Sequence, residues 1–134
     1  MKNLSLVSLI VLGAICTTKA QKISADKLPV AVKTAFEKAY PDAKQTKWDK
    51  EKNDFEASFK NQKEDLSVVF DAKGNILETE KDIPLEKLPA NVQKALKGKK
   101  ISETAIIIKG GKTFYEAEVG GKDLLFDSNG NPVK

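Results

Sequence analysis

Glu56 and Glu116 are the residues whose type and placement could carry out acid–base chemistry. They occupy matching positions in Phe55-Glu56-Ala57 and Tyr115-Glu116-Ala117. On one face of a sheet, two such carboxylates could flank a glycosidic bond as acid and base. No nearby feature of the sequence would raise one pKa selectively, so ordinary polar strand positions are the favoured interpretation. A carboxylate-based hydrolase acting on envelope glycans remains the alternative.

The residue types needed for most other catalytic sites are missing. The chain has no histidine, and its one cysteine is Cys16 in the N-terminal segment. Nucleophiles paired with histidine, thiol redox chemistry and the usual zinc or iron sites therefore lack their residues. The sequence predicts a protein that is not an enzyme and has no cofactor.

Two short acidic segments, 71–75 and 127–131, contain pieces of a calcium-binding loop. A full loop has its glycine at the sixth position and a closing glutamate. Here Gly74 and Gly130 are fourth, Lys73 stands at a ligand position, and no glutamate closes either segment. Hairpin turns are therefore predicted at both places, and no metal site.

The N-terminal segment is typical of a secretory signal peptide. A lysine precedes an apolar run from Leu4 to Ile15, and Thr18-Lys19-Ala20 provides a small-x-small end, so we expect residues 1–20 to be removed. Lipid attachment at Cys16 is the disfavoured alternative, because bulky Ile15 precedes it. The run is too short for a membrane span, which takes roughly 20 residues. The predicted location is periplasmic or secreted.

Charge argues against nucleic-acid binding. Without the lysines of the signal peptide, 21 lysines face 19 acidic residues, and the chain has no arginine. The two signs alternate finely, as in residues 49–54, which is typical of a solvated surface. Clustered cations and stacking aromatic residues, which a nucleic acid would require, are missing.

An internal repeat organises the remaining chain. Residues 27–36 recur as residues 87–96, sixty positions later, so we predict a single domain over residues 21–134 made of two repeats, 26–80 and 86–134. Apolar spacing predicts a helix after Pro29 and another after Pro89. Strands are predicted at 44–50, 55–60, 66–70 and 76–80, with a linker at 81–86, and then at 105–108, 114–119, 124–126 and 132–133. The predicted class is α+β: a tandem repeat of a helix followed by a four-stranded antiparallel meander, with the helices packed on one face of the sheet.

The other face of this sheet is the candidate binding surface. Alternation places Val69, Phe114 and Leu125 there as apolar points among the charged residues Glu56, Glu116 and Lys60. A one-residue bulge would turn Phe114 toward a sheet edge instead. Trp48 is a possible hot spot, but packing between helix and sheet is the favoured role for a side chain of this size.

These features together resemble the PepSY-like family of small secreted bacterial proteins, which is similar in architecture to β-lactamase inhibitory protein. The resemblance is carried by Leu28-Pro29, Tyr40-Pro41, Trp48, the 55–59 strand, and residues 69–71 with Gly74. The second repeat departs from it, with Ile108 in place of Trp48, and the chain lacks the disulfides of the inhibitory protein. The resemblance implies an envelope location and binding or inhibition without catalysis.

The sequence thus predicts a non-enzymatic binding or inhibitory module. Its expected partner is a protein or peptide of the cell envelope, with no nucleic acid and no membrane span. A structural component of the envelope is a second alternative. The identity of the partner and the oligomeric state stay open.

Overall fold

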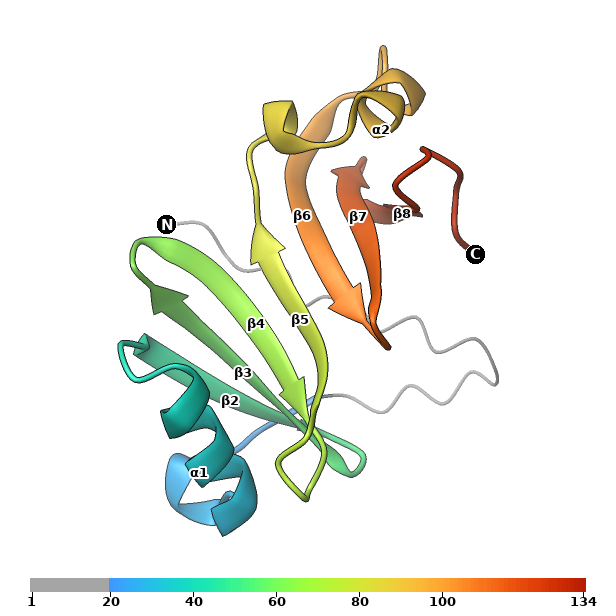
Figure 1. Ribbon diagram of the computed structural model, residues 1–134. Helices are drawn as coiled ribbons and strands as arrows, with labels where there is room; N and C mark the ends of the chain where they lie inside the picture. The colour runs from blue at the N-terminus through green and yellow to red at the C-terminus, as the bar shows by residue number, and fades with distance from the viewer. Residues whose placement is uncertain (1–19) are drawn as a thin grey trace.

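One antiparallel sheet organises the chain in a computed structural model that describes residues 20–134. The predicted signal peptide thus lies, apart from Ala20, outside the described residues. Eight strands follow one another across the sheet in chain order. Figure 1 shows the succession from β2 to β8. The strands are β1 (Gln21–Lys22), β2 (Lys44–Glu51), β3 (Asp54–Asn61), β4 (Glu64–Phe70), β5 (Ile76–Asp82), β6 (Ile101–Lys109), β7 (Lys112–Val119) and β8 (Lys122–Phe126).

Proline marks the start of both helical segments. Pro29 precedes α1 (Val30–Ala39), and Pro89 precedes the shorter α2 (Ala90–Ala95). Each proline carbonyl accepts a hydrogen bond from the first turn, whereas the missing proline N–H would have had no partner there. Tyr40, the residue before Pro41, leaves the helical region and ends α1. Short 3₁₀ turns, η1 (Ala25–Lys27) and η2 (Leu85–Lys87), lead into the two segments.

The predicted tandem repeat of a helix and a four-stranded meander, with helices packed on one face of the sheet, is wrong. The structure is mainly one eight-stranded sheet, with α1 as its one full helix in the described chain. Its C-terminal half contributes β6, β7 and β8, followed in the described residues by an isolated bridge between Phe126 and Pro132 instead of a strand. Proline cannot donate to a strand ladder, which disfavours a strand at this point. The second helix stops after six residues.

The segment 81–86, predicted as a linker, begins within a strand. β5 extends to Asp82 and pairs with β6 from Glu78↔Lys109 to Asp82↔Ala105. This pairing joins the two halves into one continuous sheet. The strand expected at the edge of the first unit is therefore central.

Two apolar clusters lie on the face that we call the inner face, which carries Ala57 and Ala117. In the first cluster, the Phe36 ring of α1 meets the rings of Trp48 and Phe59 edge to face, with both centroid distances 5.0 Å. The core role predicted for Trp48 is thus confirmed, since it is 7% exposed. The second cluster contains Leu88, Val92, Leu96, Ala117 and Phe126.

Two acidic turns hold the ends of the hairpins. The Asp71 carboxylate accepts backbone hydrogen bonds from Lys73 and Asn75, both at 2.9 Å. Asp127 accepts the same bonds from Asn129 and Asn131. These bonds lower the pKa of both carboxyl groups, through the Asn75 side chain first for Asp71 and the Asn131 backbone first for Asp127. The turns predicted at 71–75 and 127–131 are confirmed, but only the first joins two strands, β4 and β5, whereas the second leads to the isolated bridge at Pro132.

None of the helices in the described part of the chain has the length and apolar character for crossing a bilayer.

Candidate functional site

The candidate site is the sheet face opposite the inner face, which we call the outer face. Directly paired residues of neighbouring antiparallel strands share a face, so the register defines its rows. One row runs Glu56, Val69, Glu78, Lys109; the next runs Ser58, Ser67, Glu80, Ile107, Phe114; the third runs Asp82, Ala105, Glu116, Leu125. Neither apolar cluster includes the side chains of these rows.

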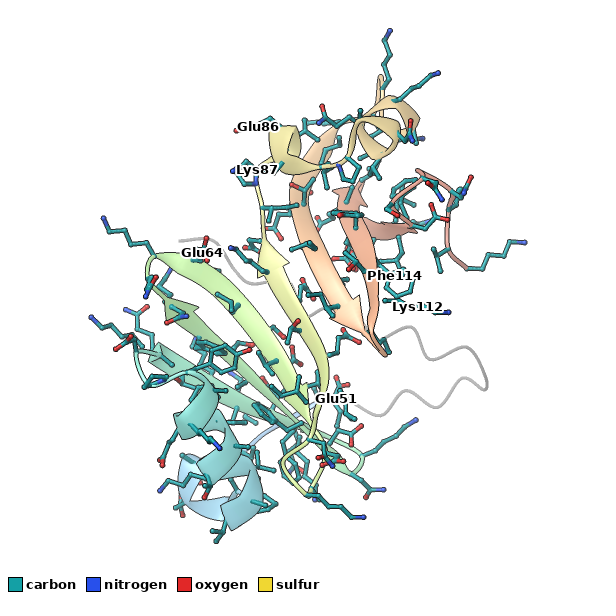
Figure 2. All side chains as sticks on the ribbon, in the orientation of Figure 1. Glu51, Glu64, Glu86, Lys87, Lys112 and Phe114 are labelled. Carbon is teal, nitrogen blue, oxygen red and sulfur yellow. The ribbon has the colours of Figure 1, made fainter. Side chains whose placement is uncertain are left out.

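All the predicted binding residues lie on this face, but they form two groups. Glu56 and Val69 are direct partners across β3 and β4, and Glu116 and Leu125 are direct partners across β7 and β8. Phe114, which Figure 2 labels, lies on β7. It is half-buried and stands two residues before Glu116 in the sequence. β5 and β6 separate the two groups.

Sequence reasoning missed the residues between these groups. Glu78 and Glu80 on β5 are 8% and 9% exposed, and Ile107 on β6 is 5% exposed. The available signal was the acidic residue at every second position of β5, from Glu78 to Asp82. That alternation places the carboxyl groups on one face, but it could not show that β5 is central in the sheet.

The acidic residues of this face differ in their partners. Glu56 accepts a hydrogen bond from the Ser67 hydroxyl at 2.5 Å, and Glu78 forms an ion pair with Lys109 at 2.9 Å. No hydrogen bond or ion pair joins the carboxyl group of Glu80 to another described residue. Burial of most of the Glu80 side chain favours the neutral form of its carboxyl group, although the carboxyl oxygens still contact solvent.

Burial and mutual repulsion raise the pKa values at the centre of the face. Burial, followed by the charge of Glu116, raises the pKa of Glu80 to about 9. Burial, followed by the charge of Asp123, raises the pKa of Glu116 to about 7. Burial also raises the pKa of Glu56, although the hydrogen bond from Ser67 lowers it in part.

The geometry does not support joint catalysis by Glu56 and Glu116. They lie on β3 and β7, which are four strand spacings apart, or roughly 19 Å at about 4.8 Å per spacing. The two carboxylates of a glycosidase are only about 5–9.5 Å apart. No group of three or more possible metal ligands occurs among residues 20–134.

The inner face also has a hollow, of about 440 Å³, between the two apolar clusters. Its walls include Tyr40, Leu66, Ile106 and Tyr115. Ile108, on the same face, is 49% exposed. The hollow is broad and open, and none of the predicted binding residues reaches it.

Comparisons with known proteins agree with this architecture. The family described as "Putative beta-lactamase-inhibitor-like, PepSY-like" matches twice, over residues 15–78 and 63–134. A structure from Bacteroides eggerthii, described among "putative periplasmic proteins", is 21% identical with a TM-score of 0.73, and the match covers 80% of this chain and 86% of that one. A BLIP-like protein from Bacteroides fragilis is 24% identical with a TM-score of 0.64, and the match covers 78% and 82%. Curated proteins give no match.

Proposed function

This chain belongs to the beta-lactamase-inhibitor-like, PepSY-like family, and we propose that it is a non-enzymatic module that binds a protein or peptide of the cell envelope. The outer face is the contact surface. The observation that carries this proposal is the row structure of the face, in which Val69, Ile107, Phe114 and Leu125 lie among carboxyl groups. A mixed apolar and charged sheet face that neither helix of residues 20–134 covers fits a protein partner better than a small ligand.

Three further points support this proposal. The B. fragilis protein of similar fold is described as BLIP-like, and the B. eggerthii protein as periplasmic. The N-terminal segment has the composition of a secretory signal. The acid–base pair required by the hydrolase alternative is divided between distant strands, which leaves binding as the favoured function. We therefore propose a periplasmic or secreted location for the protein.

Affinity capture with matched variants tests this surface. The double variant F114D/L125D places two charges on the outer face, while I108D places one charge on the inner face at an exposed position. An envelope protein retained by the wild type and by I108D, but lost from F114D/L125D, is the expected result. Circular dichroism must show that all variants remain folded. Equal retention by all of them would refute the assignment of the outer face.

A further inference from the structure

Glu80 is the most unusual side chain of the outer face. It is 9% exposed and has no hydrogen bond or ion pair with another described residue. Its direct neighbours across the sheet are Ser67, whose hydroxyl donates to Glu56, and the apolar Ile107. The fold therefore buries most of this side chain and gives its carboxyl group no partner among the described residues, while the carboxyl oxygens themselves still contact solvent. An opposite charge from outside would complete the site.

Acidic groups outnumber basic ones around Glu80 on the outer face, although the neighbouring strand β6 contributes Lys109. The acidic groups are Glu56 on β3, Asp65 on β4, Glu78 and Asp82 on β5, Glu116 and Glu118 on β7, and Asp123 on β8. Two lysines of this face are engaged, since Lys109 pairs with Glu78 and Lys60 pairs with Asp65, and Lys112 lies beside Lys109 at the end of the first row. The centre of the face therefore has an excess of negative charge, which complements a cation.

The walls indicate which kind of cation fits. Ile107 and Phe114 follow Glu80 in the same row, and Leu125 lies opposite Glu116. A metal ion would need several oxygen ligands together, and no such group is found between residues 20 and 134. Lysine and arginine instead have an apolar stem below a charged head, and an aromatic ring can contact that head. A basic side chain therefore matches both the carboxyl groups and the apolar walls.

We propose that Glu80 and Glu116 form the acceptor for one lysine or arginine side chain of the protein that binds the outer face, and that this binding releases a proton. The inference rests on the proposed function and specifies the chemistry of the partner. Binding couples to protonation because the cation favours the ionised carboxylate, whereas the empty site holds the neutral acid. The proton leaves the Glu80 carboxyl group for the solvent as the basic group takes its place.

Proton release on binding predicts the direction in which the affinity changes with pH. Raised pKa values, about 9 for Glu80 and about 7 for Glu116, mean that at least one of the two carboxyl groups is neutral at neutral pH. Affinity for a cationic partner should then increase as the pH rises from 7 toward 9. A neutral or anionic partner would instead prefer the protonated site, and its affinity would decrease over the same range.

Selection from a library of random linear peptides on the purified protein supplies the probe. We expect enriched peptides to carry lysine or arginine beside apolar residues. The substitution Glu80→Gln should reduce the affinity of the protein for these peptides about tenfold or more, because a charge-assisted contact is lost. Glu64→Gln is the control, since it makes the same chemical change at an exposed inner-face ion pair with Lys81. Calorimetry in buffers of different ionisation enthalpy should show proton release with the wild type and little with Glu80→Gln.

The possible outcomes separate this inference from the proposed function. Peptides that are lost on F114D/L125D but bind Glu80→Gln as tightly as the wild type, or bind without releasing a proton, would overturn the cation site and leave the contact surface intact. Peptides that bind both F114D/L125D and the uncharged variant F114S/L125S unchanged would overturn both, since the second variant adds no charge that could attract the cation. A library that yields no binder would also count against both.

Discussion

The Ser67 hydroxyl donates to Glu56 at 2.5 Å, although the residue directly opposite Ser67 on β5 is Glu80. One serine therefore decides which of two neighbouring acids is stabilised in its ionised form. Glu56 gains a donor that lowers its pKa, while Glu80 has none. Glu56 therefore has a hydrogen-bond donor for its carboxylate, and Glu80 does not.

Replacing Ser67 with alanine should raise the pKa of Glu56 above its present, already raised value. Among the main influences on the Glu56 pKa, the hydrogen bond from the Ser67 hydroxyl is the one that lowers it. The free energy of unfolding should decrease by about 1 kcal/mol, the usual contribution of one hydrogen bond. Carbon-detected NMR titration of the glutamate carboxyl groups measures the pKa. Ser58→Ala, which removes a hydroxyl from the same row, is the control. An unchanged Glu56 titration in Ser67→Ala would contradict the role assigned to this bond.

Glu80→Gln should stabilise the protein at alkaline pH. The Glu80 pKa rises from 4.5 to about 9 on folding, so the folded state binds the proton more tightly than the unfolded state does. Stability from this group is complete below about pH 4.5 and is lost as the pH rises toward 9, by at most about 1.4 kcal/mol per pH unit. Denaturation at a series of pH values should show that Glu80→Gln removes the decline between pH 7 and 9.

Glu116→Gln provides the matched control for that titration. The pKa of the Glu116 carboxyl group is raised only to about 7, so the contribution of Glu116 to stability is lost between about pH 4.5 and pH 7. This variant should therefore flatten the lower part of the curve. Because the charge of Glu116 also helps to raise the Glu80 pKa, the upper decline should move to lower pH but should not disappear. The assignment to Glu80 fails if Glu116→Gln removes the upper decline, or if Glu80→Gln leaves it unchanged.

Gly130→Ala should destabilise the C-terminal turn by more than its backbone conformation alone requires. Gly130 has φ +82°, and an added Cβ would lie 2.6 Å from the Asn91 carbonyl oxygen of α2. Gly121 has a similar φ of +74° but open space around the added Cβ, so Gly121→Ala measures the conformational cost, about 1 kcal/mol. Thermal denaturation should give a clearly lower melting temperature for Gly130→Ala than for Gly121→Ala. Equal losses would show that the turn does not pack on α2.

The sequence predicted local features better than the arrangement of the sheet. Phe55, Ala57 and Phe59 alternate cleanly, and the structure buries all three. The face of Phe114 also followed from alternation and is confirmed by its register with Ile107. Such patterns depend on neighbouring residues, which the sequence lists directly.

Pairing between distant strands could not be read in the same way. Pro84 interrupts the chain shortly after β5, which made residues 81–86 look like a linker. Whether β5 ends a sheet or continues into β6 depends on contacts between the two halves, and local periodicity contains no information on them. The burial of Glu80 follows from that pairing, so the central part of the candidate site was missed for the same reason.

Phe36→Ala and Leu96→Ala should each lower the stability of the whole described domain, although they lie in different apolar clusters. Phe36 contacts four aromatic rings, and its loss should reduce the free energy of unfolding by about 3–5 kcal/mol. Leu96 is 2% exposed, and its loss should cost about 2–5 kcal/mol. Val30→Ala, at an 81% exposed position of α1, should change little.

Because the sheet is continuous, unfolding of either variant can be followed with the same two spectroscopic probes. Trp48 fluorescence reports on the first cluster, while far-ultraviolet circular dichroism reports on all strands. Because β5 and β6 pair along five positions, unfolding of one half exposes the edge of the other, and both probes should give one coincident transition in each variant. If Leu96→Ala instead shifts the dichroism transition and leaves the Trp48 transition in place, the halves unfold independently, and the pairing of β5 with β6 does not couple them.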